Sequence, residues 1–365
     1  MDIGYILEKH IGQNGPISFR DFMEASLYYP GYGYYTSNPE IFGSKGDFYT
    51  APLISSVFGE MVATQIEEMW IRLDKKPFTI VEFGAGNGML SRDILSALQH
   101  NDLLYRDLRY CIIEKSPSLR QQQRLMLNSR VQWYDQIEQL GDFTGCVFTN
   151  EVLDNFAVYQ VIMQEQLMEL AVDFNEDFEE ILRPADQFLV DYFKDLEIIL
   201  NRGFRTEVNL QTNDWIFEIA KYLQRGFVLT IDYGFSAEDL YLSPQRSMGT
   251  LRCYYKHVMN ANPFIHIGKQ DITAHVNFTS LKNWGEKYGL HFSGYTNQSY
   301  FLRALGLAER LKNRKNERDK DSSDDEKIEA IYKLVHEMGC RMKVMVQQKG
   351  VKDTKLKGFM FPLAL

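Results

Sequence analysis

The sequence predicts an α/β protein built on a doubly wound, mostly parallel sheet. Three observations support this fold class. Residues 79–88 (TIVEFGAGNG) read as a strand that ends in a glycine-rich turn and enters a helix. Short apolar runs then alternate with helical patterns, which implies parallel strands with both faces covered. Two more strand-like segments come late in the chain, at 291–298 and 341–348.

The elements of this sheet can be justified in order. Leu90, Ile94 and Leu98 fall at helical spacing, so a helix follows the glycine turn. Ser116 and Pro117 suit the N-cap and the first position of a second helix. Apolar runs predict further strands over 109–113, 131–135, 145–149 and 227–231, and a later helix over 278–288.

Two long insertions interrupt the core, at 158–224 and 235–277. Both leave the carboxyl ends of predicted strands, where ligands of such sheets bind, so we expect a lid or substrate lobe. The first insertion begins with a predicted hairpin over 158–174. Two helical runs follow it, at 186–201 and 212–224.

The expected domain limits follow from these insertions. Residues 1–75 form a helical, aromatic N-terminal part that closes the site. The core comprises 76–157, 225–234 and 278–365, and the two insertions form the substrate or lid lobe.

The composition of the chain excludes several classes of function. The formal net charge is −9, which argues against broad nucleic-acid binding. The four cysteines form no CxxC pair, so neither a metal site nor a redox motif is expected. We read no signal or transit peptide and no apolar stretch that could cross a membrane, and we therefore expect a cytoplasmic protein.

The glycine turn suggests the cofactor. Gly84, Gly86 and Gly88 form a GxGxG pattern, whereas the dinucleotide fingerprint GxGxxG needs its third glycine at the position of Met89. Glu82 sits poorly beside a pyrophosphate but suits a cationic group, such as the α-ammonium of S-adenosyl-L-methionine. A glycine-rich turn alone remains equally consistent with an ordinary strand–helix connection.

Acidic residues at later strand ends extend this site. Glu114 ends the second predicted strand, where a carboxylate can accept both hydroxyls of an adenosine ribose. Asp135 ends the third, where it could accept from an adenine amino group. Either residue could instead be a surface acid.

The fourth predicted strand leads into NEVLDNF, which contains Asn150, Glu151 and Asp154. We expect these side chains to face the transferable methyl group. On a helical turn, Glu151 and Asp154 share one face and could grip a guanidinium, although acids also favour helix starts for electrostatic reasons. His275, near the end of the second insertion, is a candidate proton acceptor.

The N-terminal part holds GSKGDFYTAP at residues 43–52. Gly46 and Asp47 belong to a turn, and Phe48 and Thr50 could close over a ligand. Packing is the simpler reading of such an aromatic loop.

Taken together, these motifs resemble one family. GSKGDFYTAP, VEFGAGNG, EKSPSLRQQQ, NEVLDNFAVYQ, IDYG, GTLR and DITAHVNF occur in the order found in the MidA family of S-adenosyl-L-methionine-dependent methyltransferases. The resemblance spans residues 16–348. It implies a class I methyltransferase fold, the Rossmann-like doubly wound sheet with a late antiparallel strand, and a helical substrate lobe.

The resemblance also implies site roles. Glu82, the three glycines and Glu114 would bind the cofactor; Gly46, Asp47, Phe48 and Thr50 would help close the site; Asn150, Glu151 and Asp154 would face the acceptor. Mitochondrial members of the family methylate protein arginine and assist assembly of respiratory complex I. We therefore expect a protein substrate, no nucleic acid and no membrane, and leave a homodimer open.

Three alternatives remain at this stage. A small-molecule methyltransferase would use the same cofactor site with an aromatic lid. A non-catalytic assembly factor would keep the fold, but the intact acidic and glycine positions argue against it. A dehydrogenase is disfavoured by Met89 and by the late strand pair.

Overall fold

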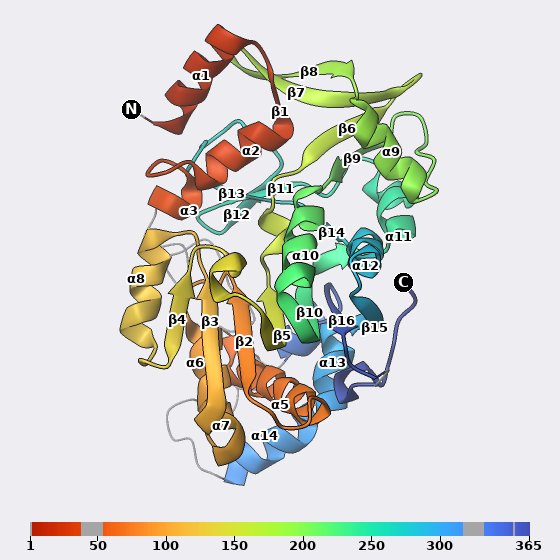
Figure 1. Ribbon diagram of the computed structural model, residues 1–365. Helices are drawn as coiled ribbons and strands as arrows, with labels where there is room; N and C mark the ends of the chain where they lie inside the picture. The colour runs from red at the N-terminus through yellow and green to blue at the C-terminus, as the bar shows by residue number, and fades with distance from the viewer. Residues whose placement is uncertain (1, 38–53, 317–331, 353–354) are drawn as a thin grey trace. The chain divides into compact units, whose positions relative to one another are not determined.

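The computed structural model describes residues 2–37, 54–316, 332–352 and 355–365 (Figure 1). The chain divides into two compact units. The first comprises Met1–Phe48, Leu153–Asp214 and Gly234–Leu281, and the second comprises Tyr49–Val152, Trp215–Tyr233 and Lys282–Leu365. The domain limits expected from the sequence stay a prediction.

The second unit is built on a sheet with the strand order β15-β16-β10-β5-β2-β3-β4. Neighbours from β10 to β4 pair in parallel, whereas β16 runs antiparallel to both β10 and β15. The doubly wound sheet with a late antiparallel strand is therefore confirmed. The bounds are β2 Phe78–Phe83, β3 Leu108–Ile113, β4 Val131–Tyr134, β5 Phe143–Asn150, β10 Leu223–Phe235, β15 His291–Asn297 and β16 Met342–Lys349.

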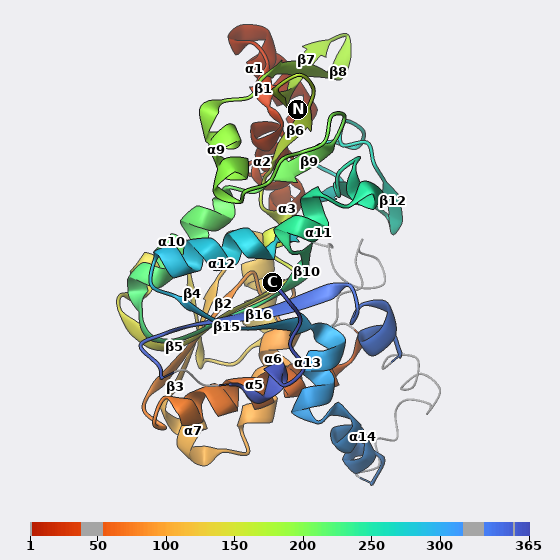
Figure 2. The ribbon, with the colours of Figure 1, turned by 90° about the vertical axis from the view of Figure 1, so that its right-hand side faces the viewer.

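Helices cover both faces of this sheet, which explains the near-continuous apolar runs of its strands. Figure 2 shows α10 and α12 on one face and α5, α6 and α13 on the other. The helices that lie wholly or mainly in this unit are α5 Ser56–Arg72, α6 Met89–Leu98, α7 Asp102–Asp107, α8 Pro117–Met126, α10 Gln211–Tyr222, α12 Phe278–Lys287, α13 Gln298–Leu305 and α14 Leu307–Asn316, with short turns η1 Ile137–Leu140, η4 Lys333–Glu337 and η5 Lys357–Phe359.

The strand order fixes where a ligand can bind. The chain moves outward from β2 to β3 and β4, then returns to β5 on the other side of β2. Parallel sheets bind ligands at the carboxyl ends of the strands where this reversal occurs. The glycine turn follows β2 at that edge, as the sequence predicts.

The first unit contains two antiparallel sheets. β1, β7, β6 and β9 form one, with β8 also paired to β7, and β12, β11 and β13 form the other. Its elements are α1 Ile3–Asn14, β1 Ile17–Ser18, α2 Phe19–Tyr28, α3 Tyr34–Ser37, η2 Leu153–Asn155, β6 Tyr159–Met163, β7 Leu167–Asn175, β8 Asp177–Pro184, α9 Gln187–Asp195, β9 Arg205–Val208, α11 Ala237–Tyr241, η3 Pro244–Arg246, β11 Arg252–Tyr255, β12 Val258–Asn260, β13 Asp271–Thr273 and β14 Val276–Asn277.

The first insertion holds more strand than the sequence predicts. The hairpin β6–β7 is present, but β8 and β9 were not foreseen. β8 alternates exposed and half-buried side chains, so it lacks an apolar run that would mark it. The helical run expected over 186–201 is shorter, because Glu197 adopts a left-handed backbone with φ +55°.

Two absences apply to the described ranges only. No helix within them is long and apolar enough to cross a membrane. They also hold no group of three or more His, Cys, Asp and Glu side chains that could bind a metal ion.

A substitution at Gly145 can test how closely β5 and β2 are packed. It lies in β5, and a Cβ added there would sit 1.8 Å from the backbone oxygen of Thr79 on β2. We expect Gly145→Ala to lower the free energy of unfolding by about 3 kcal/mol or more, measured by urea denaturation, because two paired strands must move apart. Gly141→Ala is the control: φ there is +66° but no atom lies within 4 Å, so a cost of about 1 kcal/mol is expected. Equal losses would contradict the packing argument.

Candidate functional site

The glycine turn between β2 and α6 needs glycine at three positions. Gly84, Gly86 and Gly88 have φ angles of +64°, +53° and +85°, a left-handed region that side chains disfavour. A Cβ at Gly84 would also lie 2.8 Å from Cγ2 of Val152. The backbone N–H of Gly84 donates to the carbonyl of Ile113 at 3.0 Å, which fixes the turn to the end of β3.

Glu82 lies inside the fold beneath this turn. Its side chain is buried, and Oε2 accepts hydrogen bonds from the hydroxyls of Ser91 at 2.5 Å and Tyr110 at 2.7 Å. Burial raises the pKa of Glu82 to about 7, against the opposing effect of the two hydroxyls. Glu82 therefore braces α6 and β3 together, while its contact with an ammonium group stays a prediction.

Glu114 follows β3 and is also buried. Its Oε1 accepts from the backbone N–H of Ser116 at 2.8 Å, and its Oε2 accepts from the side-chain amide of Gln123 at 3.0 Å. Burial raises the pKa of Glu114, which these hydrogen bonds and the charge of Arg120 oppose. The carboxylate is thus held rigidly at the carboxyl end of β3, where the ribose contact was predicted.

Gln123 links this acid to the glycine turn, and sequence reasoning missed it. Its amide nitrogen also donates to the carbonyl of Gly86 at 2.8 Å, and its Oε1 accepts from the indole N–H of Trp133 on β4 at 2.9 Å. Gln123 lies four residues after Leu119 on the buried face of α8. That helical spacing is the one signal in the sequence that could have found it.

Asp135 comes one residue after β4 and is exposed. Its Oδ1 accepts from the guanidinium of Arg120 at 2.6 Å, and Arg120 also donates to the backbone carbonyl of Glu114. Asp135 therefore already has a cationic partner, and its contact with an adenine amino group stays a prediction. Gly46, Asp47, Phe48 and Thr50 lie outside the described residues.

The turn after β5 carries two predicted acceptor-facing residues. Asn150 ends β5, and its amide donates to Oε1 of Glu151 at 3.0 Å. Glu151 has a φ of +55°, which is costly for a residue with a side chain. Its backbone N–H donates to the carbonyl of Ile231 on β10 at 2.9 Å.

Asp232 fixes this turn and was not singled out from the sequence. Its side chain is fully buried, three residues before the end of β10. Oδ2 accepts from the backbone N–H of Val152 at 3.1 Å, and Oδ1 accepts from that of Tyr233 at 2.8 Å. The signal was available in the IDYG segment, where an acid interrupts the end of an apolar run.

Asp154 belongs to the first unit, within a buried polar cluster. Its backbone carbonyl accepts from the N–H of Ala274 at 2.9 Å. The amide of the next residue, Asn155, donates to both carboxylate oxygens of Asp271 at 3.1 Å, and the Tyr35 hydroxyl donates to Oδ1 at 2.9 Å. Burial, followed by the charge of Asp271, raises the pKa of Tyr35.

His275 lies in the same unit, in a loop held by a buried acid. Its backbone N–H donates to the hydroxyl of Thr250 at 3.0 Å. Glu207, which sequence reasoning missed, accepts from the backbone N–H groups of Thr250 at 2.9 Å and Leu251 at 3.2 Å. The His275 ring packs against Phe235 with centroids 5.2 Å apart. The structure thus shows how the backbone of His275 is positioned, while its proton-accepting role stays a prediction.

The Gln123 bridge generates a stability prediction. We expect Gln123→Ala to lower the free energy of unfolding by about 3 kcal/mol, because Trp133, Glu114 and Gly86 each lose a buried hydrogen-bond partner. Urea denaturation measures it. Gln121→Ala makes the same chemical change at an exposed position of α8 and should cost less than about 0.5 kcal/mol. Similar losses in both variants would show that the bridge contributes little.

Glu82 generates a pH prediction. Because the pKa of Glu82 is raised to about 7 in the folded state, the folded protein binds more protons than the unfolded chain above the ordinary pKa of about 4.5. The stability from this group is therefore complete below about pH 4.5 and is lost as pH rises through about 7. Between pH 5 and 8 the wild type should lose roughly 2 kcal/mol relative to Glu82→Gln, which lacks this titration. Parallel pH profiles of unfolding would contradict the assignment.

The chain is similar in sequence and in structure to known methyltransferases. Residues 61–296 match a family model described as "Putative S-adenosyl-L-methionine-dependent methyltransferase". A crystal structure of a Burkholderia thailandensis protein bound to S-adenosyl-homocysteine is 31% identical with a TM-score of 0.89, covering 99% of this chain and 95% of that chain. The class I methyltransferase fold expected from the motifs is therefore confirmed.

Curated relatives extend the similarity. The mitochondrial protein arginine methyltransferase NDUFAF7 homolog of Drosophila melanogaster is 26% identical over 342 residues, which covers 84% of this chain and 75% of that protein. Human NDUFAF7 is 26% identical over 339 residues, covering 83% and 73%. These relatives are mitochondrial, so the prediction of a cytoplasmic location is wrong by this comparison.

The glycine turn, the strand order and the family match agree with one another. The chain belongs to the family of S-adenosyl-L-methionine-dependent methyltransferases, and it is an enzyme that uses S-adenosyl-L-methionine as its cofactor.

Proposed function

We propose that the enzyme methylates a guanidinium nitrogen of arginine in a protein substrate. The names of the curated relatives support this acceptor, and their similarity extends over most of the chain. The observation that carries the proposal is the backbone of Glu151, held left-handed at the carboxyl end of β5. A strained acid at this edge of the sheet suits a role toward a cationic acceptor.

The residues at the glycine turn fit the cofactor. Three left-handed glycines leave the backbone between β2 and α6 without side chains, so a ligand can approach it closely. Glu114 accepts hydrogen bonds from the backbone N–H groups of Ser116 and Lys115 and from the amide of Gln123. A carboxylate has about four lone-pair sites, so acceptor capacity remains for a ribose hydroxyl. S-Adenosyl-L-methionine, when bound, supplies a methyl group on a positively charged sulfur.

Transfer of the methyl group depends more on the alignment of nitrogen, carbon and sulfur than on acid or base catalysis. A nitrogen of the acceptor forms a bond to the methyl carbon while the carbon–sulfur bond breaks and its electron pair stays on sulfur. Correct alignment of these atoms supplies much of the rate. The protein contributes to this alignment by holding two turns at the carboxyl ends of the strands in place. Gln123 fixes the turn proposed to bind the cofactor, and Asp232 fixes the turn that carries Glu151.

A nearby carboxylate can make a guanidinium a better methyl acceptor. The guanidinium is protonated at neutral pH and its nitrogens are poor nucleophiles. Glu151 accepts hydrogen bonds from the guanidinium, which orients it, and takes its proton as the new bond forms. Asn150 holds the Glu151 carboxylate through the 3.0 Å hydrogen bond. The roles of Asp154 and His275 toward the acceptor stay predictions from the sequence.

Glu151→Gln separates chemistry from binding. The amide keeps the shape but cannot take a proton, so we expect kcat to fall at least about a hundredfold. The Kd for S-adenosyl-homocysteine, measured by calorimetry, should change less than about threefold. Glu176→Gln is the matched control, since Glu176 is also left-handed (φ +68°) and exposed on the β7–β8 turn. A Glu151→Gln variant that binds cofactor and methylates at the wild-type rate would refute the role.

The acceptor itself can be identified directly. Incubation of the enzyme with labelled S-adenosyl-L-methionine and a lysate of the source cell should label a protein band. Mass spectrometry should place the methyl group on an arginine nitrogen. Label in the small-molecule fraction, or on another side chain, would overturn the arginine assignment while leaving the methyltransferase activity intact.

A further inference from the structure

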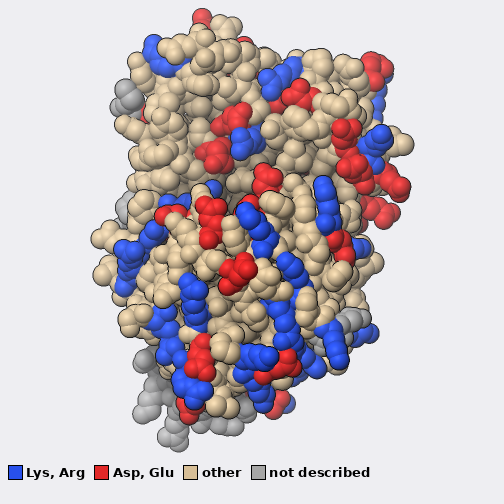
Figure 3. Space-filling model, in the orientation of Figure 1, with Lys and Arg blue, Asp and Glu red and all other residues tan. Residues whose placement is uncertain are grey.

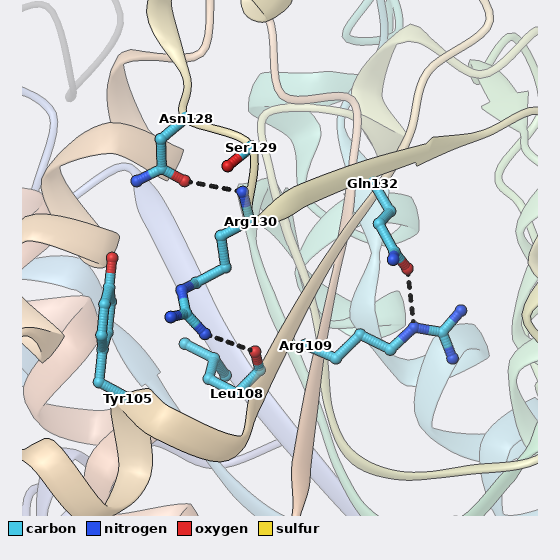
Figure 4. Close-up of a pocket in the computed structure, with 7 residues that line it drawn as sticks. All are labelled: Tyr105, Leu108, Arg109, Asn128, Ser129, Arg130 and Gln132. Atoms are coloured by element: carbon cyan, nitrogen blue, oxygen red, sulfur yellow. Dashed lines mark hydrogen bonds between the residues drawn. The ribbon is translucent and has the colours of Figure 1, made fainter.

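Lys and Arg side chains lie at the surface of the second unit, among Asp and Glu (Figure 3). Arg109 and Arg130 line a hollow where β3 and β4 begin, and Figure 4 shows their guanidinium groups extending away from each other. Arg109 donates to the side chains of Gln132 and Tyr134, and Arg130 donates to the carbonyl of Leu108. Because separate partners hold the two groups, this hollow does not bring their charges together.

The buried acids of the first unit do bring two charges together. Eight acidic side chains among the described residues are buried, whereas no described Lys or Arg is, and Asp154 and Asp271 are two of the eight. Burial is the largest effect that raises the pKa of Tyr35, and the charges of Asp271 and, less strongly, Asp154 raise it further. Both carboxylates therefore lie within electrostatic reach of one hydroxyl group.

The turn η2, which carries Asp154, is held by segments that are distant in the sequence. All three of its carbonyl groups accept hydrogen bonds from outside the turn: that of Leu153 from the Asn209 amide at 3.1 Å, that of Asp154 from the Ala274 N–H at 2.9 Å, and that of Asn155 from the Tyr28 hydroxyl at 3.3 Å. The backbone on both sides of the Asp154 side chain is thus fixed.

The Asp271 carboxylate fixes the turn from its side-chain face. The amide nitrogen of Asn155 lies 3.1 Å from both carboxylate oxygens of Asp271, and the Tyr35 hydroxyl donates to Oδ1 at 2.9 Å. Asp271 is 1% exposed and begins β13, which pairs with β11. Hydrogen bonds to a buried carboxylate are strong, because water does not compete for it.

The two tyrosines come from one short stretch of the N-terminal part. The rings of Tyr28 and Tyr35 stack with their centres 5.4 Å apart and their planes at 16°. Tyr28 donates to the turn and Tyr35 donates to the carboxylate that holds it. The stacked pair therefore supports both ends of the link between Asp271 and Asn155.

We propose that Asp271 is a positioning residue for methyl transfer, which acts through Asn155 to keep Asp154 in one orientation toward the acceptor arginine. The inference rests on the proposed function and on the predicted role of Asp154. Asp271 itself need not touch the acceptor. Its effect on the rate is expected because a displacement of about 1 Å at a group that orients the substrate can cost up to a hundredfold.

A double-mutant cycle tests the proposal with the wild type, Asp154→Asn, Asp271→Asn and the double variant. The measurement is the initial rate of label transfer from S-adenosyl-L-methionine to protein in a dilute lysate of the source cell, which is proportional to kcat/KM. In Asp271→Asn the new amide has one acceptor oxygen, which Asn155 and Tyr35 must share, so we expect a loss of about tenfold. Asp154→Asn should lose at least as much, and the double variant should be within about twofold of Asp154→Asn alone.

Two further variants protect this test from a folding defect. Asn155→Ala removes the link but keeps the bond between Tyr35 and Asp271, and it should lose about as much as Asp271→Asn. Asp173→Asn is the matched control, since Asp173 is half-buried on β7 and accepts from the N–H of Phe174. It should keep the wild-type rate. The Kd for S-adenosyl-homocysteine, measured by calorimetry, should change less than about threefold in every variant.

The outcomes separate positioning from general stability. Losses that multiply in the double variant, a wild-type rate in Asp271→Asn or in Asp154→Asn, or an equal loss in Asp173→Asn overturns the positioning role. Label on a side chain other than arginine overturns the proposed acceptor instead, which mass spectrometry of the labelled wild-type product reveals before any variant is compared.

Discussion

The hydrogen bonds of the Gln123 side-chain amide are the interaction on which the edge that carries the proposed cofactor site depends. One amide group holds the glycine turn after β2, the acid after β3 and the tryptophan of β4. These three segments belong to or follow successive strands. Backbone hydrogen bonds from Gly84 to Ile113 and from Glu114 to Tyr134 continue the pairing just past the strand ends, and the Gln123 side chain then ties all three segments to one another. Fixing them through one buried side chain gives the edge a single geometry, which a reaction that relies on alignment needs.

Buried acidic side chains likewise hold neighbouring segments together by hydrogen bonds elsewhere in the chain. Glu82 accepts from two hydroxyls, Asp232 from two backbone N–H groups, and Glu207 from the backbone of the GTLR loop. A buried carboxylate is costly unless hydrogen bonds compensate it. The acids therefore act as anchors that turn flexible loops into defined surfaces, and burial raises the pKa of Glu82 and Glu207 as a consequence.

The sequence predicts the sheet well because its signals are local. Strands such as β2 and β5 are apolar runs ended by glycine or acidic residues, and Ser116 with Pro117 marks the start of α8. The anchors could not be predicted in the same way. Gln123 is 37 residues from Gly86, Asp232 is 80 residues from Val152, and Glu207 is 43 residues from Thr250. Such pairs exist only once the chain has folded, and β8 escapes prediction because its side chains carry no apolar pattern.

The position of β16 has a consequence for biosynthesis. It lies between β10 and β15, although both of those strands precede it in the chain. While the chain emerges from the ribosome, β10 keeps an open edge and β15 has no strand to join until residues 342–349 have been made. An unpaired, apolar strand edge invites pairing with other chains. The nascent enzyme therefore passes through a period in which its sheet needs protection, and the length of that period is set by the segment that connects β10 to β16.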